Sequence, residues 1–161
     1  MMEYYTFEIN NEKVGYYEQN DKNDIFYAKA YMLIDGEKIE NPFWVKHQDG
    51  AILEIKFGTQ DWTIFDQPEN VYPSSATNLL LQELTHQKFF SYQSYSESKG
   101  KIVGELILKR NSNRIEEYDG ERLIRYFIQK EGIVVEYGWG GEAKSVRVGS
   151  LAEATAGTAF E

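Results

Sequence analysis

The chain has 161 residues, a length typical of one globular domain with its own core. Its formal net charge of -9 disfavours nucleic acid and anionic lipid surfaces as partners, and no apolar run approaches the roughly 20 residues that cross a bilayer. The absence of Cys excludes disulfides and thiolate metal sites, and the first residues lack the basic and apolar regions of a signal peptide. We therefore expect a cytoplasmic protein without an integral membrane segment.

Strands are the predicted main element, because 15% of the residues are aromatic and apolar residues recur at every second position in most segments. The rows that share one predicted face are, in chain order, Tyr5, Phe7 and Ile9; Phe26, Ala28, Ala30, Met32 and Ile34, with Tyr27, Lys29 and Tyr31 opposite; Leu53, Ile55 and Phe57; Ile124, Tyr126 and Ile128, with Arg125 opposite; and Ile133, Val135, Tyr137 and Trp139. Short turns of Asn, Asp and Gly separate these runs. The pattern predicts an antiparallel meander of about ten to twelve strands.

Two parts of this pattern are similar to each other. The turns at Asp35-Gly36 and Asp49-Gly50, with the strand from Ala51 to Phe57, are echoed by the turns at Asp119-Gly120 and Glu131-Gly132, with the strand from Ile133 to Trp139. The first pair of turns is two residues further apart, and the excess falls near Asn41-Pro42. Because proline cannot donate to a sheet, we expect a bulge or an edge there. An internal repeat and chance similarity between hairpins both explain the match.

One helix is predicted between the two blocks of strands, over residues 74 to 85. Pro73 suits a helix entry, Ser74 or Ser75 offers a capping oxygen, and Leu79, Leu80, Leu81 and Leu84 form an apolar stripe. A helix this short needs a partner surface, and we expect it to pack on the concave side of the sheet. The predicted fold is mainly β: a strongly curved antiparallel meander, an open half-barrel or β-roll, with one helix on its concave face.

The domain organisation follows from the same pattern. Residues 1–149 are predicted to form a single β-rich domain. From Ser150 onward the sequence is small and weakly patterned, so residues 150–161 are predicted to be a C-terminal tail that either docks through Leu151 and Phe160 or frays.

The order of strands, a central capped helix and further strands resembles the open half-barrel of bacterial lipoprotein-localisation carriers. It is also similar to bacterial domains of unknown function described as glycolipid-binding. The resemblance covers roughly residues 3 to 148 in the order of elements and includes no specific motif. In those families a helix plugs a curved sheet whose concave face receives acyl chains, and residues 74–84 would be that plug here. The exported carriers have a signal peptide; the first residues here do not show that pattern, so we do not expect a role in lipoprotein trafficking.

The function we predict is non-enzymatic binding of a small apolar or amphipathic ligand, such as a lipid or glycolipid, between helix and sheet. Aromatic rings commonly line such pockets, and this chain has more of them than a small core needs. The predicted ligand-binding residues are Tyr27, Tyr31, Trp44, Trp62, Tyr72, Leu79, Leu84 and Trp139. No metal, catalytic or nucleotide-binding motif is evident, so we expect no cofactor.

Two other classes of function stay open. In a protein interaction module, a partner would bind an exposed sheet edge or the acidic first part of the chain, where residues 1–70 carry 14 acidic and 6 basic side chains. An enzyme would use Glu54 or Glu136, which occupy equivalent places in the suspected repeat and would need an apolar pocket to act as acid or base.

Overall fold

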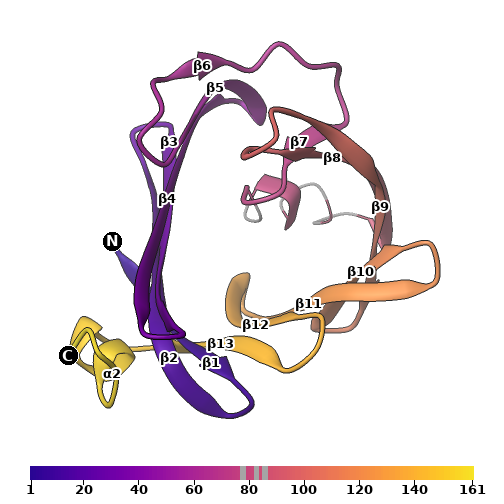
Figure 1. The fold of residues 1–161 in the computed structure, drawn as a ribbon. Coiled ribbons are helices and arrows are strands. Elements are labelled where there is room, and N and C mark those ends of the chain that lie inside the picture. The colour runs from indigo at the N-terminus through magenta and orange to yellow at the C-terminus, as the bar shows by residue number, and fades with distance from the viewer. Residues whose placement is uncertain (77–78, 82–83, 85–86) are drawn as a thin grey trace.

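The computed structural model describes residues 1–161 except 77–78, 82–83 and 85–86. Within these described residues the chain forms one open sheet of 13 strands. They are β1 (Glu3–Ile9), β2 (Glu12–Lys22), β3 (Ile25–Ile34), β4 (Glu37–Gln48), β5 (Ala51–Phe57), β6 (Thr63–Ile64), β7 (Val71–Pro73), β8 (Phe89–Ser96), β9 (Lys101–Asn111), β10 (Arg114–Asp119), β11 (Arg122–Lys130), β12 (Ile133–Trp139) and β13 (Ala143–Val148). The sheet curls around a short helical segment (Figure 1). The predicted fold class is confirmed.

The two halves of the chain meet in the middle of the sheet. The strand order is β6-β5-β4-β3-β2-β1-β13-β12-β11-β10-β9-β8-β7, so β1 pairs with β13 although they lie near opposite ends of the sequence. The two edge strands, β6 and β7, have two and three residues. The pairs are antiparallel except β7 with β8, which is parallel. Residues 65–70 connect one edge of the sheet to the other, and the curvature brings these edges toward each other (Figure 1).

The helical segment inside the curve joins two groups of core side chains. Residues 79–81 are helical, and Leu79, Leu80, Leu81 and Leu84 are all buried. Leu79 packs with the core residues of β3 to β5, whereas the other three leucines pack with core residues of β1 and β8 to β12. Each fully buried leucine contributes about 1.5 to 3 kcal/mol. This segment therefore fills the space between the two halves of the sheet, as predicted. The helix predicted over 74–85 starts too early, because Pro73 ends β7 and residues 74–76 are not helical; residues 77–78, 82–83 and 85 of that range lie outside the described residues.

The approach to this helical segment is fixed by a buried carboxylate. Glu97, in the turn between β8 and β9, accepts a hydrogen bond from the Ser74 hydroxyl and another from the Ser75 backbone N–H, both at 2.7 Å. Ser74 was predicted to offer a capping oxygen, but its hydroxyl donates to Glu97. Glu97 thus accepts from one side-chain donor and one backbone donor just before the segment.

Two matching hairpins carry a β-bulge at the same place. In β12, Glu136 lies opposite Ile128 and Val134 lies opposite Gln129, so Val135 has no partner in β11. In β5, Leu53 is skipped in the same way, between the pairs Lys46 with Glu54 and His47 with Ile52. The turns before both strands, Asp49-Gly50 and Glu131-Gly132, have positive φ at both residues. The similarity between these hairpins thus extends to their turns and bulges.

The bulges correct the predicted faces of these strands. Strict alternation placed Ile133, Val135, Tyr137 and Trp139 on one side, but Val134 is 5% exposed in the core whereas Ile133 is 41% exposed. Leu53, predicted to share a face with Ile55, is likewise 45% exposed. One extra residue in a strand moves the side chains before it to the opposite face of the sheet. A period of two therefore does not continue across a bulge.

We expect Val134→Ala to lower the free energy of unfolding by about 2 kcal/mol, because it removes buried methyl groups and leaves a cavity. Ile133→Ala serves as the control, and its effect should stay below about 1 kcal/mol because that side chain faces solvent. Urea unfolding of both variants tests the register. Equal effects, or a larger effect at Ile133, would mean that the bulge is misplaced.

The proline in β4 lies at an edge, one of the two outcomes predicted for it. Residues of β3 and β4 pair without a register shift, so Asn41-Pro42 forms no bulge. β5 ends at Phe57, opposite Phe43, and the Pro42 carbonyl accepts from the Gly58 N–H at 2.9 Å. The proline nitrogen, which lacks a hydrogen, therefore faces the side where β5 has ended.

The last residues dock on the outer surface of the sheet. Residues Leu151–Thr155 form helix α2, whose Ser150 cap accepts from the Glu153 N–H. The ring of Phe160 packs edge-on against Tyr16 and Tyr31, while Leu151 is 44% exposed. Of the two docking residues expected in this tail, Phe160 makes the contact. The helix was not predicted, although Ser-x-x-Glu at residues 150–153 is a capping signature.

Candidate functional site

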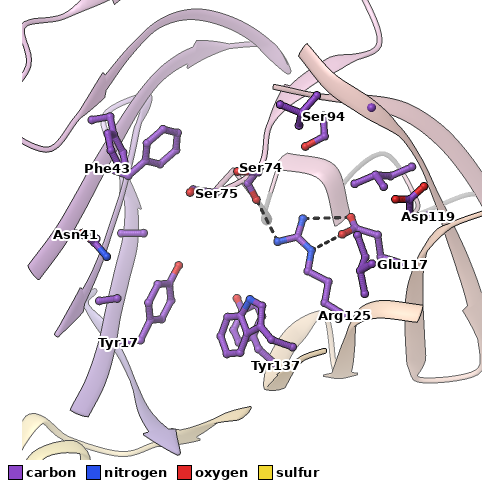
Figure 2. A pocket seen from close by; sticks show the side chains of 18 residues that line it. Tyr17, Asn41, Phe43, Ser74, Ser75, Ser94, Glu117, Asp119, Arg125 and Tyr137 are labelled. Carbon is purple, nitrogen blue, oxygen red and sulfur yellow. Dashed lines mark hydrogen bonds and ion pairs between the residues drawn. The ribbon is translucent and has the colours of Figure 1, made fainter. Parts of the chain in front are cut away.

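A cleft of about 630 Å³ lies on the concave face, between the first and second halves of the sheet (Figure 2). Its described lining residues are Tyr17, Ala28, Ala30, Asn41, Phe43, Phe57, Ser74, Ser75, Ser94, Val103, Gly104, Leu106, Glu117, Asp119, Ile124, Arg125, Tyr137 and Trp139. Its size falls within the range of about 300 to 1,000 Å³ that small-molecule sites occupy. Because Val103 is 50% exposed and Asp119 is also exposed, the cleft opens to solvent.

The wall formed by β3 to β5 is mainly apolar. Ala28, Ala30, Phe43 and Phe57 line it, and Asn41 adds one amide. Phe43 and Ala28 belong to the buried core behind the wall, so their positions are fixed by packing. This wall offers a ligand apolar contact and few hydrogen bonds.

Small residues leave the cleft open. Ala28 and Ala30 present single methyl groups, and a Cβ added to Gly104 would have no heavy atom within 4 Å. Gly104 does not have a positive φ, so its backbone would accept a side chain. Glycine inside a strand weakens the strand. Gly104 therefore keeps the cleft empty at some loss of stability.

The opposite wall contains a buried ion pair. Arg125 Nε donates to Glu117 Oε1 at 2.6 Å and Nη2 donates to Oε2 at 3.1 Å, while Nη1 donates to the Ser74 carbonyl at 3.1 Å (Figure 2). The Glu117 side chain is 1% exposed and that of Arg125 is 13% exposed. Burial lowers the pKa of Arg125 and the Glu117 carboxylate raises it, with a net rise, so the guanidinium stays charged.

Tyr92 completes this group. Its hydroxyl donates to Glu117 Oε2 and accepts from Arg125 Nη2. Burial raises the pKa of Tyr92 above its usual value, so the hydroxyl keeps its proton and remains a donor. The Glu117 carboxylate is thereby bound from two sides, and the chain segment at Ser74 is tied to β11 through Arg125. The group is a rigid part of the wall with its main hydrogen bonds already made.

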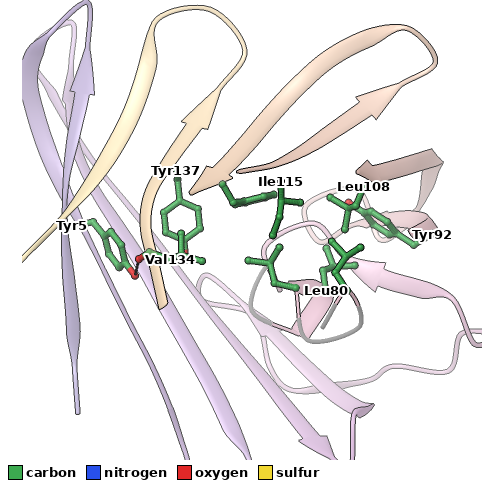
Figure 3. Close-up of a cluster of buried hydrophobic side chains, with 10 residues drawn as sticks. Tyr5, Leu80, Tyr92, Leu108, Ile115, Val134 and Tyr137 are labelled. Carbon is green, nitrogen blue, oxygen red and sulfur yellow. Dashed lines mark hydrogen bonds between the residues drawn. The ribbon is translucent and has the colours of Figure 1, made fainter. Parts of the chain in front are cut away.

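A buried glutamine, Gln19, forms hydrogen bonds with two of the tyrosines that line the cleft. Gln19 is 1% exposed; its amide nitrogen donates to the hydroxyls of Tyr5 and Tyr137, and its amide oxygen accepts from Tyr17 at 3.0 Å. The Tyr5 hydroxyl also donates to the Val134 carbonyl at 3.0 Å (Figure 3). Tyr17 and Tyr137, which line the cleft, are therefore held in place by hydrogen bonds as well as by packing.

The predicted ligand-binding residues are not brought together. Trp139 lines the cleft. Tyr27, Tyr31 and Trp44 lie on the outer face of the sheet, with Tyr27 against Trp44, and Trp62 lies under the Lys46 ammonium. Tyr72 borders a separate pocket between β5 and residues 65–72. Leu79 and Leu84 are core residues.

The two glutamates considered for catalysis lie apart from the cleft. Glu54 pairs with Lys46 across β4 and β5 at 3.3 Å. Glu136 accepts from the Tyr126 hydroxyl at 2.6 Å, and burial together with this bond raises the pKa of Tyr126 to about 12. Neither carboxylate is among the residues that line the cleft. Within the described part of the chain, no group of three or more His, Asp or Glu side chains suits a metal ion.

Sequence reasoning missed most of this site. Arg125, Glu117, Gly104 and Gln19 were not identified as site or core residues. One usable signal was parity: Arg125 shares a strand face with Phe127, whose burial marks that face as the inner one. Tyr126, which the alternation pattern grouped with Ile124 and Ile128, lies outside, against Gly138.

Comparison with known proteins found no matching family model, no matching curated protein and no matching solved structure. Among the described residues, no helix is both long and apolar enough to cross a membrane. The function must therefore be argued from the cleft.

Proposed function

We propose that this protein is a non-enzymatic domain that binds one small amphipathic molecule, of the lipid or glycolipid kind, in the cleft between the two halves of its sheet. The observation that carries the proposal is a solvent-open cleft of about 630 Å³ on the concave face, which small residues keep unfilled. A concave, partly apolar surface of this size that the chain leaves uncovered is the usual form of a small-molecule site.

The chemistry of the walls supports an amphipathic ligand. The β3 to β5 wall is apolar, and the opposite wall carries hydroxyls and charged groups. The resemblance to half-barrels that receive acyl chains on their concave face agrees with this arrangement. The helical segment fills part of the concave face with leucines and leaves the cleft beside residues 74 and 75.

Replacing Gly104 by Leu tests the proposal. The side chain would point into the cleft, since Leu106 and Leu108 on the same strand face are inward. We expect the free variant to gain about 0.5 to 1 kcal/mol in stability, because glycine is unfavourable in a strand. We expect it to bind monodecanoylglycerol at least about tenfold more weakly, because the leucine side chain occupies volume that the bound probe needs, and overfilling a site costs about 1 to 3 kcal/mol. Calorimetric titration and thermal unfolding measure the two effects.

Gly140→Leu is the matched control. This variant introduces the same side chain at a glycine that is not among the residues lining the cleft. A Cβ added to Gly140 would meet only the Ile124 carbonyl oxygen, at 3.5 Å. This variant should bind the probe as the unmodified protein does. Equal binding by the Gly104 and Gly140 variants would contradict the assignment of the cleft. A lack of saturable binding to the unmodified protein, across uncharged and charged amphiphiles, would leave an interaction module as the better account.

A further inference from the structure

The charged groups among the described lining residues lie on one wall. Glu117 and Asp119 come from β10 and Arg125 from β11, and Ser94 of β8 adds a hydroxyl, whereas the wall from β3 to β5 contributes Asn41 as its one polar side chain (Figure 2). Ser74 and Ser75, in the turn after β7, lie between the two walls. A bound amphiphile therefore places its polar group toward β8, β10, β11 and this turn, with its apolar part toward Phe43 and Phe57. The charge on that wall therefore decides which polar groups are accepted.

That wall is acidic. Its described residues include two carboxylates, Glu117 and Asp119, and one guanidinium, Arg125. The Arg125 charge is compensated at short range by the bidentate bond with Glu117. Asp119 pairs with Arg122 at 3.4 Å, but the two side chains are 57% and 76% exposed, so solvent screens this pair. The formal charge of the whole chain, -9, adds to the negative potential.

We infer that the cleft selects amphiphiles whose polar group is uncharged and bears hydroxyl donors, and that it disfavours those ending in a carboxylate. This inference rests on the proposed function. A hydroxyl donates to the Asp119 carboxylate and accepts from a serine, so it uses both kinds of group on the wall. A ligand carboxylate has no proton to donate at neutral pH and meets the negative charge of Asp119 directly.

Two probes with the same acyl chain test the inference. Monodecanoylglycerol has a hydroxylated, uncharged polar group, and decanoate ends in a carboxylate. We expect the protein to bind monodecanoylglycerol roughly tenfold more tightly at neutral pH and low salt, the size of effect that one like charge about six ångströms away has in a partly exposed site. Added salt should narrow the difference by screening. Calorimetric titration below the micellar concentration of each probe measures both affinities.

Asp119→Asn tests the residue that we hold responsible. It removes one negative charge from the wall, and we expect it to raise the affinity for decanoate several-fold without strengthening the binding of monodecanoylglycerol. Asp24→Asn is the matched control: Asp24 is exposed in the turn between β2 and β3, away from the cleft, and the Asn side chain tolerates its positive φ of 60°. The control changes the net charge equally and should leave both affinities unchanged.

The outcomes separate the inference from the proposed function. Binding of neither probe would count against the function itself. Binding of both with equal affinity, or tighter binding of decanoate, would overturn the charge selectivity while leaving a ligand-binding cleft. Equal effects of the two Asp variants would show that overall charge, and not Asp119, sets the preference.

Discussion

Replacing Arg125 by Met is expected to lower the free energy of unfolding by about 3 to 5 kcal/mol, the usual loss when one partner of a buried ion pair is removed. The variant leaves the Glu117 carboxylate, 1% exposed, without its guanidinium partner. It also removes the bond from Arg125 to the Ser74 carbonyl, which ties the approach to the helical segment to β11. Because small domains are stable by only about 5 to 15 kcal/mol, the variant should unfold at markedly lower denaturant concentration.

Two further variants make this result interpretable. Arg122→Met removes an exposed arginine from the same strand, and we expect an effect below about 1 kcal/mol. Combining Arg125→Met with Glu117→Leu removes both charges, which should restore part of the stability, since no buried carboxylate is then unpaired. Urea unfolding of the three variants measures these differences. If Arg125→Met were as stable as Arg122→Met, the pair would not be buried as described.

Replacing Leu80 by Asp is expected to prevent stable folding. Leu80 is 1% exposed, among side chains from both β8 and β12 (Figure 3). A carboxylate there would be buried without a partner, which costs several kcal/mol even if it takes up a proton. Thermal unfolding monitored by near-UV circular dichroism should show either no cooperative transition or a midpoint lowered by more than about 15 °C.

Leu151→Asp is the control, because Leu151 is 44% exposed in a helix and should tolerate the change. Leu80→Met keeps the volume and should lose less than about 1.5 kcal/mol, so it reports on packing even if the Asp variant cannot be purified. An Asp variant as stable as the control would show that the helical segment does not plug the sheet.

The architecture could be predicted because most of the long strands show a period of two over much of their length, and the turns between them contain Asn, Asp or Gly. These signals are local, so they do not depend on how the rest of the chain folds. The bulges at Leu53 and Val135 could not be predicted in this way. A bulge depends on how two strands pair, so the exposure of Ile133 in place of Val134 appears only when β11 and β12 are placed side by side.

The site was harder to predict than the fold, for a physical reason. Large aromatic residues were expected to line a ligand cavity. Five do line the cleft, namely Tyr17, Phe43, Phe57, Tyr137 and Trp139, but the open space itself lies where side chains are small. On β3, the cleft side carries Ala28 and Ala30, while Tyr27 and Tyr31 occupy the outer face. There the Tyr31 ring stacks on Tyr16 with 4.3 Å between ring centroids, and the Lys29 ammonium lies 4.5 Å from the centroid of the Tyr31 ring.

The buried ion pair escaped prediction because a charged residue in an alternating strand normally faces solvent. Arg125 and Glu117 lie on neighbouring strands and are directly paired in the sheet register. Each becomes acceptable on the inner face only because the other is there. A single sequence shows the two residues but not their pairing, so the polar wall of the cleft became visible only with the structure.

Native mass spectrometry of the protein purified without detergent, in the presence of monodecanoylglycerol, tests the central claim most directly. We expect the unmodified protein to carry one molecule of the probe, and the Gly104→Leu variant to remain unoccupied under the same conditions, while Gly140→Leu behaves as the unmodified protein does. A bare chain mass for all three proteins, or several probe molecules bound equally to all three, would contradict a defined binding cleft on the concave face.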